Sequence, residues 1–195
     1  MNQGIARAVA ALALLIAVAL SQTACVPLLI GGAVVGTAAV ATDRRSTGAQ
    51  LDDEVIEDKS VFAIHERFKG DFHINVTSFN GIVLLTGEVP SAASKTDVGE
   101  LLRTTPKVRA VQNELVVGPV TDIQSRTNDT LITSKVKSRF VEAAKFQINY
   151  VNVVTEHGVV YLMGIVRREE GDAAAEIART TNGVQRVVKV FEYIN

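Results

Sequence analysis

The sequence contains an internal repeat, which limits the possible folds more than any other feature of the chain. Residues 74–89 align with residues 151–166 at a constant offset of 77, and both segments hold a β-rich run, a glycine turn and a second apolar run. A further match, Arg103-Thr104-Thr105 with Arg179-Thr180-Thr181, has an offset of 76, so the copies differ by one residue in a loop. A duplication of this kind encodes two copies of one structural unit.

Each copy contains a predicted β-hairpin. Residues 76–79 and 82–89 are β-rich and flank Asn80-Gly81, and the second copy has His157-Gly158 at the same place. Both positions of such a two-residue turn require a positive φ, which Gly and Asn adopt most readily. Gly87 and Gly164 fall near the ends of the second strands, where we expect a close approach of backbone or a bulge.

Helices are predicted on either side of each hairpin. Apolar residues at three-and-four spacing follow the hairpins at 98–102 and 173–178, and further helices precede them at 52–69 and 129–145. A β-branched run closes each copy, at 108–117 and 184–194. Each unit therefore reads helix, strand, strand, helix, strand.

This element order predicts an α/β (α+β) fold of two tandem small α/β sandwich domains. Each would have a three-stranded sheet with both helices on one face, while the other face meets solvent or the sister domain. Gly118-Pro119 breaks both helix and sheet. We place the first domain at residues 51–118 and the second at 119–195.

The N-terminal segment has the pattern of a signal peptide. Arg7 precedes thirteen unbroken apolar residues, Ala8 to Leu20, which are too few to span a bilayer as a helix. Small and polar residues then lead to Cys25. We predict a signal peptide over residues 1–24, with a short uncleaved membrane anchor as the alternative.

Cys25 is the predicted site of lipid attachment. Residues 20–25 resemble a bacterial lipobox, with small Thr23 and Ala24 before the cysteine, although Gln22 stands where that motif usually carries Leu. Several acyl chains on one cysteine would anchor the protein stably. Residues 25–50, rich in Gly, Ala and Val, would form a tether near the membrane.

The composition excludes several classes of protein. The 20 Lys and Arg residues balance 21 Asp and Glu residues, so the chain lacks the broad basic surface of a nucleic-acid-binding protein. The single cysteine cannot form an intramolecular disulfide, and His65, His73 and His157 lack the spacing of a zinc site. We therefore expect no metal, no cofactor and no nucleic-acid partner.

No group of residues has the pattern of a catalytic site. His65-Glu66 lacks a second histidine four residues on, as a metalloprotease helix would require. Glu169 and Glu170 are adjacent in a helix and do not share a face. No Ser, Cys or His combination supplies a nucleophile with a base. We expect no catalytic residues and no enzyme activity.

The helix expected from Asp129, its candidate N-cap, has a face with unusual exposed residues. Ile132, Val136, Phe140 and Ala143 fall on one side and should face the sheet. Apolar residues flanked by lysine on the opposite side suit contact with anionic lipid head groups, whereas scattered surface aliphatics without a role are also common. The candidate phospholipid-binding residues are Leu131, Ser134, Lys135, Ser138, Val141, Glu142 and Lys145.

The repeated unit resembles the BON domain, and two such units behind a lipobox and a tether resemble the dual BON-domain outer-membrane lipoproteins. The resemblance covers essentially the whole mature chain and includes Asn128-Asp129-Thr130. It implies a non-catalytic protein, lipid-anchored in the outer membrane and facing the periplasm. It also implies binding to anionic phospholipid through the first helix of the second domain and a role in envelope integrity.

One residue departs from the family pattern, which carries Trp where this chain has Leu131. The corresponding helix of the first domain is acidic, with Glu54, Glu57, Asp58 and Glu66, and should avoid an anionic surface. The alternative function is a periplasmic interaction module that binds an envelope protein or a peptidoglycan component and contacts lipid only through Cys25.

Overall fold

The computed structural model describes residues 43–70 and 72–195, which belong to one compact unit. The predicted signal peptide, Cys25 and the tether as far as residue 42 lie outside the described residues. Among the helices of the described ranges, none has the length and apolar character needed to cross a membrane.

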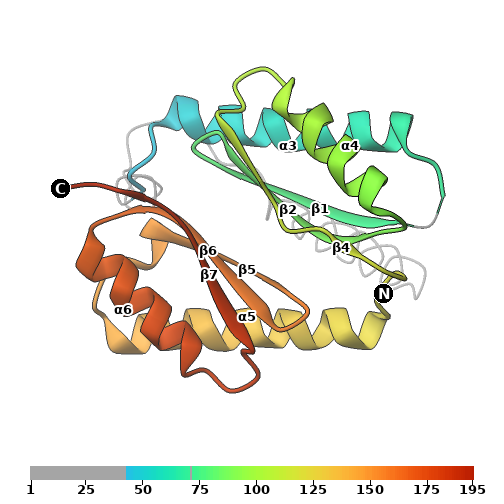
Figure 1. Ribbon diagram of the computed structural model, residues 1–195. Coiled ribbons are helices and arrows are strands. Elements are labelled where there is room, and N and C mark those ends of the chain that lie inside the picture. The colour runs from blue at the N-terminus through green and yellow to red at the C-terminus, as the bar shows by residue number, and fades with distance from the viewer. Residues whose placement is uncertain (1–42, 71) are drawn as a thin grey trace, which may run out of the picture. The chain divides into compact units, whose positions relative to one another are not determined.

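The first domain has the predicted element order and one additional short strand (Figure 1). Its central strand β2 pairs antiparallel with β1 and parallel with β3, and β4 continues the pairing along β2. The elements are α3 (Thr47–Arg67), β1 (His73–Phe79), β2 (Ile82–Val89), α4 (Ala92–Arg103), β3 (Ala110–Asn113) and β4 (Val116–Val117).

The second domain repeats this arrangement with a three-stranded sheet of order β5-β6-β7. Strand β6 pairs antiparallel with β5 and parallel with β7. The elements are α5 (Ile123–Ala143), the 3₁₀ turn η2 (Ile148–Tyr150), β5 (Val151–Glu156), β6 (Val159–Val166), α6 (Arg168–Arg179) and β7 (Arg186–Tyr193). The prediction of two α/β sandwiches is confirmed.

The first sheet differs from the prediction because its final run is divided. β3 and β4 keep one register along β2, with Leu85 opposite Asn113 and Glu88 opposite Val116. The interruption, at Glu114 and Leu115, lies opposite Thr86 and Gly87, and Gly87 has a φ of +107°. The single strand expected over residues 108–117 is therefore two strands.

Both hairpin turns have the predicted backbone conformation. Asn80 and Gly81 have φ values of 53° and 74°, and His157 and Gly158 have 51° and 69°. Two consecutive positive φ values define a type I′ turn, whose twist matches that of the flanking strands.

The first helix of each domain begins earlier than the sequence analysis placed it. Helix α3 begins at Thr47, inside the expected tether, because the Ser46 hydroxyl accepts a hydrogen bond from the Ala49 amide. Helix α5 begins at Ile123, because the Asp122 carboxylate accepts from the Ser125 amide at 2.7 Å. The N-cap assignment of Asp129 is therefore wrong, since Asp129 lies inside the helix and is buried.

Each domain buries one face of its sheet beneath its two helices. Ile132, Val136 and Phe140 of α5 are buried against β5 and β6, as predicted. Ala143 is exposed, contrary to the prediction, because α5 ends there and Ala144 adopts a left-handed conformation.

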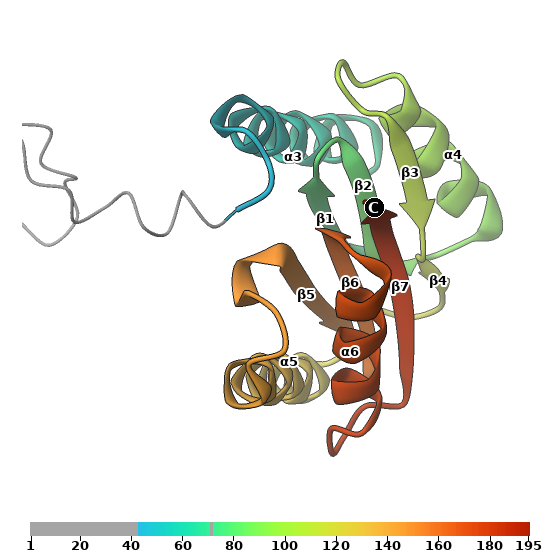
Figure 2. The same ribbon diagram turned by 90° about the vertical axis from the view of Figure 1, so that its left-hand side faces the viewer.

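The opposite faces of the two sheets pack against each other rather than facing solvent (Figures 1 and 2). Phe79 and Leu84 of the first domain form one buried cluster with Tyr161 and Met163 of the second. Polar contacts lie around this cluster, including one from Asn75 to Glu156 and one from Asn80 to Glu192. The sequence left open whether this face meets solvent or the sister domain, and the structure shows that it meets the sister domain.

Candidate functional site

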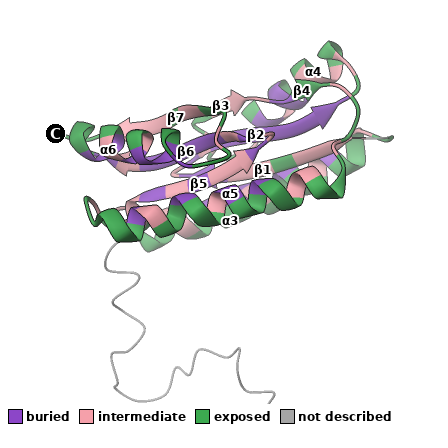
Figure 3. Cartoon of the chain, turned by 90° about the horizontal axis from the view of Figure 1, so that it is seen from below, coloured by how far each residue is buried: buried purple, intermediate pink, exposed green. Residues whose placement is uncertain are grey.

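The outward face of α5 is exposed along its length (Figure 3). All seven candidate phospholipid-binding residues are exposed, with Lys145 lying just beyond the end of the helix. At 100° per residue, Leu131, Ser134, Ser138 and Val141 fall within an arc of about 80°, while Lys135 and Glu142 lie at its edge. The structure therefore brings the predicted residues together on one surface.

The early start of α5 adds a residue that the sequence analysis missed. Ile123 is 76% exposed, more than Leu131 at 54% or Val141 at 62%. It lies eighteen residues before Val141, which is five complete turns, so both side chains point in the same direction. Asp122 as an N-cap residue was the sequence signal that would have placed Ile123 on the helix.

Three of the four hydroxyl groups on this face are already hydrogen-bonded within the helix. Thr127 donates to the Ile123 carbonyl at 2.9 Å, Thr130 to the Arg126 carbonyl at 3.0 Å, and Ser134 to the Thr130 carbonyl at 3.0 Å. A hydroxyl with an internal partner loses less free energy when water is removed from it than a free hydroxyl does. The face is therefore less costly to dehydrate than its composition suggests. We call the surface formed by Ile123, Thr127, Thr130, Leu131, Ser134, Ser138 and Val141 the α5 face.

The charges around the two first helices have opposite signs. Helix α5 carries four basic and two acidic residues, a net charge of +2, and Lys135 and Lys137 lie on either side of the α5 face. Helix α3 carries two basic and six acidic residues, a net charge of −4. Of the two helices, only α5 combines exposed apolar residues with an electrostatic attraction to an anionic surface.

A groove adjoins the C-terminal end of the α5 face. It has a volume of about 520 Å³. Its walls include apolar Phe140, Val141, Phe146 and Ile148 together with basic Lys145 and Arg167. Arg44 also lines the groove, and its guanidinium forms a bidentate pair with Glu170 at 2.6 and 2.8 Å. The groove therefore offers positive charge next to apolar surface.

Helix α3 has an exposed apolar stripe of its own, formed by Leu51, Val55 and Phe62. These residues lie on the side of α3 opposite the buried Ile56, Ser60 and Ile64. Acidic residues surround the stripe, as predicted from the sequence. Exposed Lys59 lies on one side of the stripe, whereas the α5 face has a lysine on each side.

The fold and this site define a class: a tandem α/β-sandwich protein whose sheets pack face to face and whose second domain exposes a partly apolar, basic-flanked helix. The BON domain model matches residues 52–119 and 128–195, so the chain belongs to the BON-domain family.

Relatives of this chain include proteins of the bacterial envelope. It is 37% identical to "Outer membrane lipoprotein DolP" of Haemophilus influenzae, over 94% of this chain and 96% of that protein. It is 34% identical to "21 kDa hemolysin" of Actinobacillus pleuropneumoniae, over 78% and 79% of the two chains. It is 28% identical to "Osmotically-inducible protein Y" of Escherichia coli, over 76% of each. The chain is an outer-membrane, lipid-anchored protein, and the predicted family and location are confirmed.

Proposed function

We propose that this chain is a non-catalytic envelope protein, acylated at Cys25 and facing the periplasm, that binds anionic phospholipid through the α5 face and helps to maintain outer-membrane integrity. The observation that carries the proposal is the exposed row Ile123, Leu131 and Val141 between lysines on a helix of net charge +2. Apolar burial and attraction to anionic head groups add together on such a surface. The relative named as an outer-membrane lipoprotein supports the location.

Vesicle flotation of a soluble form tests the lipid contact separately from the acyl anchor. This form should begin at Ala41, because a start at Thr47 would remove Arg44 and Arg45, which contact Glu170 and Asp53. It should bind vesicles that contain phosphatidylglycerol and bind neutral phosphatidylcholine vesicles much more weakly. Binding should also weaken as salt concentration rises.

Leu131→Glu should reduce binding to the anionic vesicles at least tenfold. The substitution removes about 2 kcal/mol of apolar burial and adds a charge that the head groups repel. The matched control is Val55→Glu in α3. Val55 is the repeat equivalent of Leu131, is exposed, and lies among acidic residues. Parent-like binding by the double variant Ile123→Glu, Leu131→Glu would contradict the proposal, provided that it melts like the parent.

A second candidate function is favoured by the exposed stripe Leu51, Val55 and Phe62 on α3. An interaction module that contacts an envelope partner through this stripe would lose its partner in Val55→Glu and keep it in Leu131→Glu. Cross-linking in cells, with the parent and the two single variants compared, would separate the two functions.

A further inference from the structure

A buried carboxylate lies in the contact between the two sheets, and only one of its two oxygens has a hydrogen-bond partner. Glu88 of β2 is 2% exposed and, like Leu84 four residues earlier, points toward the sister domain. Its Oε1 accepts a hydrogen bond from the Thr121 hydroxyl and lies 2.7 Å from His157 Nε2. Its Oε2 has no hydrogen-bond donor among the described residues. An ionised oxygen without a partner is costly to bury, so a bound cation or hydrogen-bond donor at this oxygen would stabilise the folded chain.

The neighbours of this oxygen are two further groups with lone pairs. His73 Nδ1 lies 3.3 Å from Glu88 Oε2 and likewise has no hydrogen-bond partner among the described residues. Glu156 of β5 is buried, and one of its oxygens accepts from the Asn75 amide at 2.9 Å. Ligand atoms of these three residues all lie within 4.8 Å of one another. Two ligands bound to one tetrahedral zinc ion stand roughly 3.3 Å apart, given metal–ligand bonds of about 2.0 Å.

We propose that His73, Glu88 and Glu156 bind one divalent metal ion of the zinc type at the contact between the two BON domains. One imidazole nitrogen with two carboxylates is a donor set that zinc accepts. Thr121 and His157 bind the other oxygen of Glu88 and would orient this ligand, as outer partners do in metal sites. A modest movement of the Glu156 side chain would bring its carboxylate to the same ion as His73 and Glu88.

The charge at the site favours a cation. Around the cluster, the carboxylates of Glu88, Glu156 and Asp129 stand against the single guanidinium of Arg126. With His73 neutral, as a metal ligand must be, and His157 neutral as well, three carboxylates against one guanidinium give a net negative formal charge, which a divalent cation would balance.

A solvent path reaches the ligands. A cavity of about 250 Å³ is lined by His73 and Glu156, together with Thr130 and Thr133 of α5. This volume admits the ion and leaves room for a water molecule as its fourth ligand. A bound metal would join β1 and β2 of the first domain to β5 of the second, and so would hold the two domains together.

Zinc titration of the detergent-extracted full chain, freed of metal with EDTA, tests the site. Calorimetry should show one zinc ion bound per chain. At a zinc concentration about 100 times Kd, the melting temperature should rise by roughly 5–10 °C, because the ion binds only the folded state. His73→Ala and Glu156→Gln should each weaken binding at least tenfold and remove this rise.

The matched control is His65→Ala, which removes an exposed histidine of α3 and should bind zinc like the parent. Melting curves in EDTA identify any variant that fails to fold, and Glu156→Gln keeps the volume of the side chain and an acceptor for Asn75. Parent-like zinc binding by a folded His73→Ala or Glu156→Gln variant would overturn the proposal. So would a parent chain that binds no stoichiometric zinc or that loses its binding in His65→Ala.

Discussion

Gly164 allows two neighbouring chain segments to come closer than any side chain would permit. A Cβ atom built on Gly164 would lie 2.2 Å from the Tyr150 carbonyl oxygen, and one on Gly87 would lie 2.0 Å from the His73 carbonyl oxygen. The repeat thus conserves the same close contact in its two copies, and the expectation of a close backbone approach at both glycines is confirmed. Tyr150 immediately precedes β5, and Val151, the first residue of β5, is paired with Gly164.

Gly164→Ala should lower the free energy of unfolding by about 2 kcal/mol or more, because the new methyl group must displace backbone rather than a flexible side chain. Urea unfolding of the soluble form that begins at Ala41 measures the change. Gly118→Ala is the control, since no atom lies within 4 Å of its Cβ position, and it should change stability by less than about 0.5 kcal/mol. Equal losses in both variants would contradict the contact argument.

At the scale of elements, a buried aspartate joins the first helix of each domain to its hairpin. Asp129 of α5 accepts hydrogen bonds from the His157 amide at 2.9 Å and the Gly158 amide at 2.8 Å. Asp53 of α3 accepts from the Asn80 and Gly81 amides at 2.7 and 2.8 Å. The type I′ turn leaves these amides without a backbone partner, and the carboxylate supplies it.

Asp129→Ala should therefore lower the free energy of unfolding by roughly 2–4 kcal/mol, since it leaves two amides without their charged acceptor, one of them buried. Thermal and denaturant unfolding of the soluble form would report the loss. Asp97→Ala, which removes an exposed aspartate of α4, should leave stability unchanged within about 0.5 kcal/mol. A loss below about 1 kcal/mol in Asp129→Ala would show that the turn is held by other contacts.

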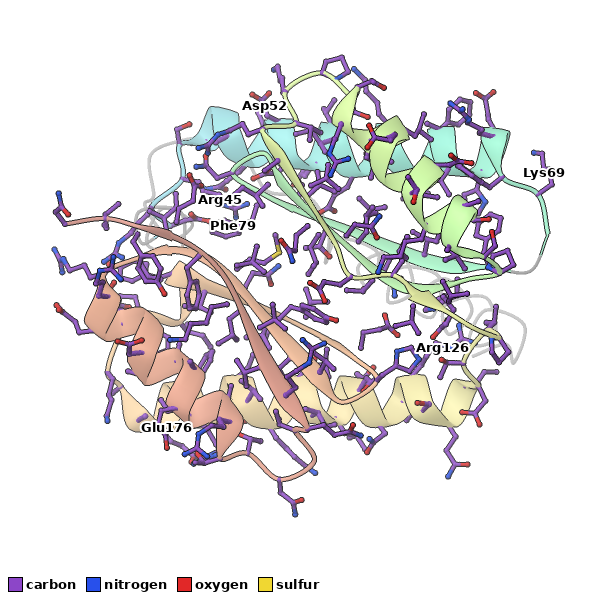
Figure 4. All side chains as sticks on the ribbon, in the orientation of Figure 1. Arg45, Asp52, Lys69, Phe79, Arg126 and Glu176 are labelled. Carbon is purple, nitrogen blue, oxygen red and sulfur yellow. The ribbon has the colours of Figure 1, made fainter. Side chains whose placement is uncertain are left out.

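At the scale of the whole molecule, two adjacent arginines before α3 contact both domains. Arg44 pairs with Glu170 of the second domain and lies 3.7 Å from the ring centroid of Tyr150. Arg45 pairs with Asp53 of the first domain and lies 4.0 Å from the ring centroid of Phe79 (Figure 4). The segment leading from the tether therefore stabilises the arrangement of the domains. The tether predicted to reach residue 50 ends before these arginines.

The Arg44 contact should make stability depend on pH. Hydrogen bonds from Arg44 lower the pKa of Glu170, and although burial raises it, the Arg167 amide lowers it further. Because the folded-state pKa lies below the unfolded-state value of about 4.3, the ionised pair contributes fully above that value. The contribution is lost as the pH falls through the folded-state pKa.

Arg44→Ala should thus lower the free energy of unfolding by roughly 1–3 kcal/mol at pH 7, and the difference from the parent should shrink below about pH 4. Denaturant unfolding of the soluble form across this pH range provides the measurement. Arg179→Ala removes an exposed pair with Glu176 and should produce no measurable change. A difference of equal size at both ends of the pH range would show that Glu170 is not the partner that matters.

The sequence by itself determined the two domains, their element order, both hairpin turns and most of the α5 face. These features depend on residues close together in the chain: the alternation of apolar residues, the helical spacing from Leu131 to Val141, and the positive φ of Asn80-Gly81. Ile123 was missed because the expected start of the helix was placed at Asp129 rather than after Asp122.

Only the tertiary structure decided which faces of the sheets meet. The contacts of Arg44, Arg45 and Glu88 were likewise decided by the tertiary structure. His73, Glu88 and Glu156 lie up to 83 residues apart in sequence, and no spacing rule connects them. They come together because the outer face of the first sheet packs on that of the second. Burial of Phe79, Leu84 and the apolar residues opposite them stabilises this packing. Local patterns record which side of a strand is apolar, whereas the identity of the surface that covers it depends on the whole fold.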